Sequence, residues 1–163
     1  MGAYLQNGFA KKQAESTRKS QIQDKKLSIV ATFPAHLYKD VALISNRSFL
    51  RFDLEAWKRQ PNHKAYLGRT RNEVLGLYGK LEDEYIKSPR SAPLLSEVKG
   101  WFCDQKILDR ATQIDEQIEG FLRIDASKLT EEDIRQFGES TREKLINLVT
   151  AMIAEVKSPQ CDY

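Results

Sequence analysis

The stretch TEEDIRQFGESTREKLINLVTAMIAEV, residues 130–156, is the strongest structural signal in this chain of 163 residues. Thr130 is a good N-cap because its hydroxyl can accept a hydrogen bond from a first-turn amide, and three acidic residues follow it at the positive end of the helix dipole. Apolar residues, with Thr141 as a weak member, then recur at steps of three and four: Ile134, Phe137, Thr141, Leu145, Leu148, Met152 and Val156. The pattern predicts an amphipathic helix that Ser158 and Pro159 end.

Two upstream segments show comparable spacing. A helix that starts with Pro93 in its first turn is expected to continue to about Leu122, with apolar residues at Leu94, Val98, Trp101, Leu108, Ala111, Ile114, Ile118 and Phe121. Residues 123–129 are its connector to the last helix. An earlier helix is expected from about Ala65 to Lys87, with Val74, Tyr78, Leu81 and Tyr85 on its apolar side.

The first helix is expected from about Pro34 to Arg59, with Leu37, Val41, Ile44, Ser48 and Phe52 on one stripe. Leu27 and Val30 extend this spacing backwards. Two possibilities stay open: a helix that starts at Pro34, or one that starts earlier and kinks there.

Similar helix lengths joined by short connectors favour antiparallel neighbours. Alternating β-branched runs between tight turns, which would predict strands, are missing. We therefore expect an all-α fold, an antiparallel up-down four-helix bundle over residues 27–158. Residues 1–26 are expected to form a polar basic extension, mobile or helical, and residues 159–163 a tail.

The net charge of +3 hides a division between the two halves of the chain. Residues 1–80 hold fifteen Lys or Arg and six Asp or Glu, a charge of +9, whereas residues 81–163 hold eleven and seventeen, a charge of −6. Such asymmetry can attract polyanions, or it can be neutralised internally between helices or between protomers of an antiparallel dimer. The candidate polyanion-binding residues are Lys11, Lys12, Arg18, Lys19, Lys25, Lys26, Arg47, Arg51, Lys58, Arg59, Lys64, Arg69 and Arg71.

Residues that usually carry catalysis or hold metals are few. His36 and His63 are the only histidines, and neither has a glutamate three positions before it, so the Glu-x-x-His pairs of a di-metal bundle are absent. We expect His36 to face solvent and His63 to lie in an exposed loop between helices. The sequence predicts no catalytic residues, no metal site and no cofactor.

Cysteine usage and apolar run length bear on the compartment. Cys103 and Cys161 are too few for a disulfide framework, and we expect free thiols in a reducing compartment. The apolar runs at residues 27–33 and 41–44 are far shorter than the roughly 20 residues of a membrane span. The expected location is cytoplasmic, with membrane association as an alternative.

Well-patterned helices without a catalytic constellation predict a non-enzymatic interaction or regulatory module that binds a protein partner or associates with itself. One alternative is salt-dependent binding of nucleic acid or an anionic membrane through the basic half, without base reading, because no aromatic residue lies among the cations between Lys11 and Phe33. Another is the cytosolic or sensing bundle of a membrane protein whose anchor is missing from this sequence.

Overall fold

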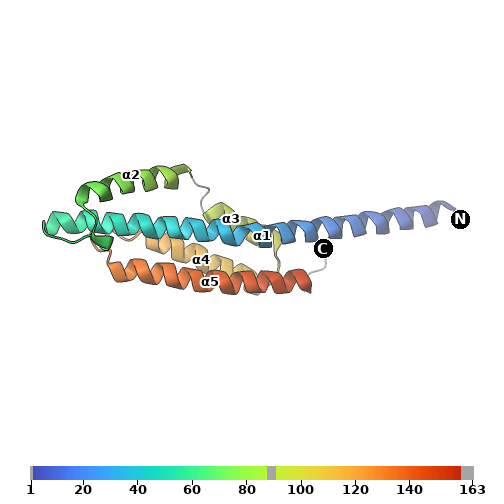
Figure 1. Ribbon diagram of the computed structural model, residues 1–163. Coiled ribbons are helices and arrows are strands. Elements are labelled where there is room, and N and C mark those ends of the chain that lie inside the picture. Colours follow the sequence, from blue (N-terminus) through green and yellow to red (C-terminus); the bar gives the residue numbers. More distant parts are fainter. Residues whose placement is uncertain (1, 88–90, 159–163) are drawn as a thin grey trace.

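The computed structural model describes residues 2–87 and 91–158, apart from the side chains of residues 2–9, 66 and 91. These residues form five α-helices and one 3-10 turn, and no strand occurs among them. The prediction of an all-α fold is therefore confirmed. The helices lie along one long axis (Figure 1). The expected tail, with Pro159 and Cys161, lies outside the described residues.

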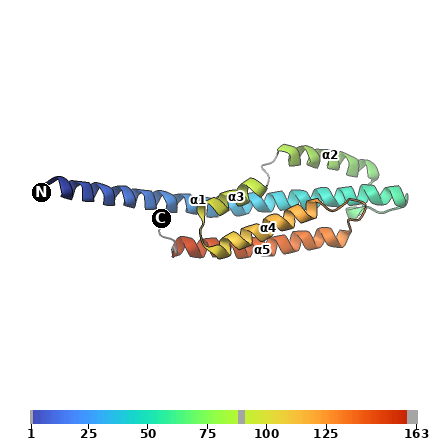
Figure 2. The ribbon, with the colours of Figure 1, turned by 180° about the vertical axis from the view of Figure 1, so that it is seen from behind.

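Helix α1 extends from Gly2 to Arg59, 58 residues with Pro34 inside. At 1.5 Å per residue it is about 87 Å long. The sequence left open whether this helix starts at Pro34 or earlier. In the structure it starts far before Pro34. A proline inside a helix removes one backbone hydrogen bond, but Phe33 and Leu37 on either side of it are buried against other helices. The first part of α1 projects beyond the other helices (Figures 1 and 2).

The buried stripe of α1 includes a charged residue. Ile29, Phe33, Leu37, Val41 and Ile44 are buried as their spacing requires, and Lys26 continues this stripe with 1% exposure. Of the two residues that extend the spacing backwards, Val30 packs against the core, whereas the side chain of Leu27 is 49% exposed and does not join the buried stripe. Steps of three and four back from Phe33 reach Ile29 and then Lys26, which finds an ion-pair partner in Glu155.

Two helices occupy the segment for which one was predicted: α3 (Ser91–Trp101) and α4 (Gln105–Leu122). Between them Phe102 is buried, and the carboxylate of Asp104 accepts a hydrogen bond from the backbone N–H of Lys106 at 2.8 Å and so starts a new helix. The break shifts the register of the apolar stripe. Leu95 and Ile107 are fully buried in place of the predicted Leu94 and Leu108, and Trp101 is 37% exposed.

Helix α2 (Arg71–Lys87) begins later than the predicted Ala65. The residues before it form a 3-10 turn, Tyr66–Gly68, in which Leu67 has a left-handed backbone conformation (φ 65°, ψ 20°) that an α-helix cannot pass through. Thr70 then provides the start signal. Its backbone N–H and its hydroxyl donate to Glu73 Oε2 at 2.7 and 2.8 Å, and these bonds lower the pKa of Glu73.

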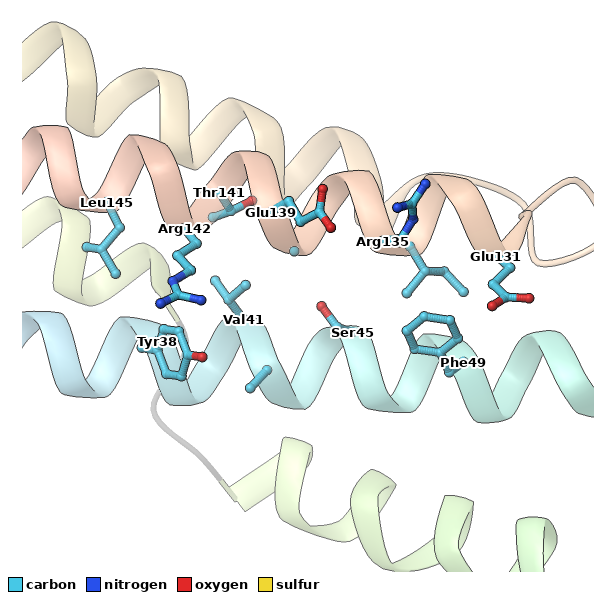
Figure 3. Close-up of a pocket in the computed structure, with 13 residues that line it drawn as sticks. Tyr38, Val41, Ser45, Phe49, Glu131, Arg135, Glu139, Thr141, Arg142 and Leu145 are labelled. Atoms are coloured by element: carbon cyan, nitrogen blue, oxygen red, sulfur yellow. The ribbon is translucent and has the colours of Figure 1, made fainter. Parts of the chain in front are cut away.

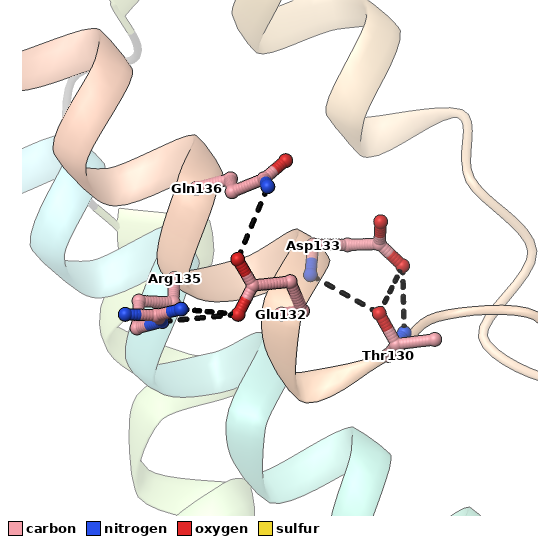
Figure 4. Close-up of polar contacts among 5 residues, drawn as sticks. All are labelled: Thr130, Glu132, Asp133, Arg135 and Gln136. Carbon is pink, nitrogen blue, oxygen red and sulfur yellow. Dashed lines mark hydrogen bonds and ion pairs between the residues drawn. The ribbon is translucent and has the colours of Figure 1, made fainter.

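Helix α5 (Glu131–Lys157) confirms the helix predicted from residues 130–156. The hydroxyl of Thr130 accepts the N–H of Asp133 at 3.1 Å, and Asp133 Oδ2 accepts the N–H of Thr130 at 2.9 Å (Figure 4). This capping box lowers the pKa of Asp133. Every residue of the predicted stripe, from Ile134 to Val156, is buried.

Buried apolar side chains form two clusters. The larger lies where α1, α3, α4 and α5 meet, and it includes Phe121 and Phe137, whose ring centroids stack at 4.0 Å. The smaller, built on Leu50, Ala65 and Val74, joins α2 and the loop before it to α1. Both ribbon views place α2 and α5 on opposite sides of α1 (Figures 1 and 2). Helix α2 therefore flanks α1, and it contacts the larger cluster only through the partly buried Tyr85.

Among the described residues, α1 is the one helix long and apolar enough to cross a membrane, judged by length and composition alone. This differs from the sequence-based prediction because the short apolar runs at residues 27–33 and 41–44 lie in one continuous helix. The core helix of a soluble protein passes the same test. Phe33, Leu37 and Ile44 are buried against other helices, so the apolar composition has a structural use here.

Candidate interaction site

A groove runs between α1 and α5, and its walls come from these two helices alone. It contains a hollow of about 360 Å³ whose apolar lining includes Val41 and Ala42 of α1 and Ile134 and Leu145 of α5. Figure 3 shows Val41 and Leu145 pointing into the space between the two helices. Polar and charged side chains line the rest of the hollow. It has the mixed lining of a binding site, apolar surface with a small number of placed polar groups.

One polar atom in this hollow is unsatisfied. The Oγ of Ser45 is buried and has no hydrogen-bond partner, and Figure 3 shows its side chain directed toward α5. Gly138 faces it: a Cβ built on Gly138 would lie 3.5 Å from Ser45 Oγ. A buried hydroxyl without a partner costs about 1–3 kcal/mol. A bound group that exchanges a hydrogen bond with Ser45 would remove this cost.

The charged residues at the edge of the hollow differ in their state. Arg135 is paired with Glu132, with Nε to Oε2 at 3.1 Å (Figure 4), and this pair raises the pKa of Arg135 and lowers that of Glu132. Arg142 is exposed and makes no ion pair or side-chain hydrogen bond with any residue of the described ranges. Its guanidinium lies beside Tyr38 in Figure 3. Arg142 is therefore free to bind an external carboxylate.

A second hollow of about 420 Å³ continues the first and shares Tyr38 and Leu145 with it. It is almost wholly apolar, with Pro34, Val149 and Ile146 in its lining. Tyr38 and Ile146 are 52% and 56% exposed, so the surface is open. Both hollows together form what we call the α1–α5 groove. It reaches from Pro34 to Phe49 along α1, a distance of about 22 Å.

The sequence analysis did not identify this groove, although a signal for it exists. Tyr38, Ala42, Ser45 and Phe49 recur at steps of four and three, which makes a second stripe beside the core stripe of α1. Two adjacent stripes on one helix indicate two packed faces. Only the structure shows that α5 covers one edge of the second stripe and leaves the rest open.

The candidate polyanion-binding residues at the start of the chain are in two different states. Lys11, Lys12, Arg18 and Lys19 lie on the projecting part of α1, where every residue from 10 to 21 is exposed. In contrast, Lys25 Nζ is paired with Glu97 Oε1 of α3 at 2.7 Å, and Lys26 is buried in its pair with Glu155 of α5. Lys26 is therefore not part of an accessible basic surface.

The second group of candidates surrounds the far end of α1. Lys58 is paired with Glu55 at 2.6 Å, and Arg59 Nη2 donates to the carbonyl oxygen of Ser127 at 2.5 Å. The remaining members are exposed or partly exposed and have no ion pair within the described ranges: Arg51, Lys64, Arg69 and Arg71.

Arg47 is a structural tie and not a free cation. Its guanidinium makes two hydrogen bonds to the carboxylate of Glu82 on α2, Nη2 to Oε1 at 2.9 Å and Nε to Oε2, and it lies 4.7 Å from the ring centroid of Tyr85. The pair raises the pKa of Arg47 and lowers that of Glu82. Since Lys11 and Arg51 are about 60 Å apart along α1, the structure does not gather the candidates into one basic patch.

His63 lies in the loop between α1 and α2, as predicted, but its side chain is only 18% exposed. Its Nε2 lies 2.8 Å from Oδ1 of Asp53, whose side chain is 2% exposed, and its ring meets those of Phe52 and Trp57 edge-on at 6.1 and 5.5 Å. An Asp–His pair is the orienting half of many hydrolytic sites. No described Ser, Thr or Cys side chain is hydrogen-bonded to His63, and its contacts anchor the loop after α1. His36 is exposed, as predicted.

Cys103 corrects the expectation of free thiols, because it is disulfide-bonded. The only other cysteine in the sequence is Cys161, which lies outside the described residues. The Sγ of Cys103 is 3.8 Å from Glu155 Oε1, beside the buried pair of Lys26 and Glu155.

Residues 2–87 and 91–158 hold no group of three or more His, Cys, Asp or Glu that could bind a metal ion. The polar chemistry described above consists of ion pairs, helix caps and the two open surfaces, the α1–α5 groove and the projecting start of α1. Comparisons with models of protein families, with curated proteins and with solved structures found no match to this chain.

Proposed function

We propose that this protein is a non-enzymatic helical interaction module and that its α1–α5 groove binds an α-helical segment of a protein partner. The observation that carries the proposal is an open apolar groove that contains the buried, unpartnered hydroxyl of Ser45 and is bordered by the unpaired cation of Arg142. Apolar surface supplies affinity in such a site, and the two polar groups set the orientation of what binds.

The shape of the groove favours a helix over a small molecule. The groove is open along its length, about 22 Å, which matches four turns of helix or about 15 residues. An amphipathic helix would place residues spaced by three and four over Tyr38, Val149 and Ile146. A carboxylate on the same helix would accept a charge-assisted hydrogen bond from Arg142.

In this proposal α1, α3, α4 and α5 are the four members of an antiparallel up-down bundle, and the partner helix binds to its outside, along α1 and α5. Contacts of α1 with α3 and α5, and of α4 with α3 and α5, support this arrangement. The bound segment would be a further helix outside these four, on the side of α1 away from α2 (Figure 2).

A comparison of two variants in the full chain tests the proposal. Ile146→Glu puts a charge into the groove, whereas Ile86→Glu puts the same charge on α2, where the side chain is 66% exposed. Both residues are exposed, so we expect each change to alter the free energy of unfolding by less than about 0.5 kcal/mol. Photo-crosslinkers placed next to each site, at positions 150 and 83, report what binds there.

We expect a defined protein to crosslink from position 150 in the wild-type chain and in the Ile86→Glu variant, with or without nuclease, and to be lost in the Ile146→Glu variant. Equal crosslinking in both variants would contradict the proposal, as would the absence of any specific product. The proposal that the protein is not an enzyme depends on the absence of a described nucleophile bonded to the Asp53–His63 pair. Enzymatic turnover of a metabolite that is lost when His63 is replaced would contradict it.

A further inference from the structure

The start of α1 carries a repeat of basic pairs. Lys11 and Lys12, Arg18 and Lys19, and Lys25 and Lys26 are successive pairs seven residues apart. Seven residues are two helical turns less about 20°, and their rise is about 10.5 Å. Because α1 is one helix over this range, all three pairs lie along one side of it.

The third pair shows what the repeat binds within this chain. Lys25 Nζ is 2.7 Å from Glu97 Oε1 on α3 and 5.9 Å from the ring centroid of Trp101. Lys26 is paired with Glu155 on α5 and lies 5.2 Å from the ring centroid of Phe102. Each lysine of the pair thus binds a carboxylate from a different helix and lies near an aromatic ring.

The first two pairs present the same chemistry on a free helix. We call residues 10–22 of α1 the N-terminal arm. Gln23, which donates to the carbonyl oxygen of Val156 at 2.5 Å, marks where α1 meets the other helices. On the arm, Lys11, Lys12, Arg18 and Lys19 are exposed, with Glu15 as the only carboxylate between Ala10 and Ile22. The ion pairs of the repeat therefore stop where α3 and α5, which carry Glu97 and Glu155, stop.

We propose that the N-terminal arm is a docking site for an acidic helical segment of a partner protein whose carboxylates recur at heptad spacing. The third basic pair shows the contact in question, because each of its lysines binds one helix-borne carboxylate, Glu97 of α3 or Glu155 of α5. The argument is charge complementarity with a bound example in the same helix. This surface is separate from the α1–α5 groove, so the inference does not depend on the proposed function.

Other anionic partners fit the arm less well. Residues 10–22 contain no aromatic side chain on which nucleobases could stack. They contain only Ile22 and two alanines as apolar residues, so the arm lacks the apolar face with which interfacial helices enter a membrane. Helix-borne carboxylates are what the third basic pair contacts, and a helical partner matches the seven-residue spacing of the pairs.

The test measures binding of two labelled synthetic peptides to the full chain by fluorescence anisotropy. One peptide carries Glu-Glu pairs every seven residues in an Ala/Gln background. The other has the same composition with pairs every five residues, which places them on different sides of a helix. We expect the heptad peptide to bind at least about tenfold more tightly, since it alone can form several ion pairs at once.

Two quadruple variants supply the control. Replacing Lys11, Lys12, Arg18 and Lys19 by Gln is expected to weaken binding of the heptad peptide at least about tenfold. Replacing four exposed lysines elsewhere, Lys80, Lys87, Lys106 and Lys128, by Gln removes the same charge and is expected to change affinity less than about twofold. The Ile146→Glu variant is expected to bind the heptad peptide as the wild-type chain does, which separates this test from that of the groove.

Several results would overturn the inference. Equal affinity for the two peptides, or equal losses in the two quadruple variants, would show unspecific attraction. Tighter binding of a DNA duplex or of phosphatidylserine vesicles than of the heptad peptide would assign the arm to that polyanion instead. A dimer in sedimentation that the arm variant abolishes, without peptide binding, would assign it to a second copy of this chain.

Discussion

Replacing Lys26 by Met tests how strongly α1 is held to the other helices. The side chains of Lys26 and Glu155 are 1% and 0% exposed, and Glu155 Oε2 has no hydrogen-bond partner even in the intact pair. Methionine keeps most of the aliphatic stem but removes the ammonium group, so the carboxylate is left buried without its cation. Removing one member of a buried ion pair costs about 3–5 kcal/mol. For a chain of this length we expect Tm to fall by roughly 6–20 °C.

The matched control is Lys39→Met. Lys39 Nζ is 3.2 Å from Glu84, but the two side chains are 66% and 46% exposed. Solvent screens such a pair, and its loss is expected to cost less than about 1 kcal/mol. Both variants remove one ammonium group from α1 and both are measured by urea unfolding followed by circular dichroism. A Lys26→Met variant no less stable than Lys39→Met would refute the reasoning about burial.

The double variant Lys26→Met/Glu155→Leu distinguishes two causes of the expected loss of stability, an unpaired buried carboxylate and lost packing of the lysine stem. Replacing both members of a buried ion pair by apolar residues is often neutral or stabilising. We therefore expect Glu155→Leu to restore most of the stability that Lys26→Met removes. If the double variant is as unstable as the single one, the cost arises from contacts of the lysine stem, including its neighbour Phe102, and not from the unpaired carboxylate.

Acid is expected to lower the free energy of unfolding. The pKa of Glu82 is lowered from 4.5 by Arg47, so this contribution is present above that value and is lost as the pH falls below it. The urea midpoint should fall between pH 6 and pH 3, and fall less in Arg47→Met. Thr130→Val removes the side-chain half of the α5 capping box and should cost about 1 kcal/mol, whereas Thr150→Val, mid-helix and exposed, should cost almost nothing. Leu67→Gly should raise the free energy of unfolding by roughly 0.5–1 kcal/mol in the same assay, because Leu67 is 69% exposed with φ 65°. A lower free energy of unfolding in Leu67→Gly would contradict the inference that the backbone at Leu67 is strained.

Helix α5 could be predicted closely because its signals are local. The capping box needs only Thr130 and Asp133, three residues apart, and the apolar stripe needs only one register. The break between α3 and α4 could not be predicted in this way. Apolar residues continue through it in the sequence, and the competing signal is a single N-cap, Asp104, next to the buried Phe102. Where two weak local signals compete, tertiary packing decides between them. It therefore also decides that Leu95 is fully buried in place of the predicted Leu94.

The long first helix and its buried lysine depend on non-local contacts. A polar segment such as residues 10–22 has no stripe that predicts a helix, but extending an existing helix is much cheaper than nucleating one. Lys26 could not be assigned to the core from the sequence, because a lysine is buried only with a partner, and Glu155 is 129 residues away. The groove could not be predicted from local sequence either, because it depends on how closely α5 approaches Ser45 of α1.

The opposite charges of the two halves are partly explained by ion pairs within the fold. Four ion pairs among the described residues join the basic half to the acidic half: Lys25–Glu97, Lys26–Glu155, Lys39–Glu84 and Arg47–Glu82. All four start on α1, which therefore uses its charge to hold α2, α3 and α5. The arm lies beyond the reach of these helices, so its cations are the largest group on α1, besides Arg51, without an ion pair in the described residues. A partner that binds the arm would continue along α1 the interaction that already holds the other helices to it.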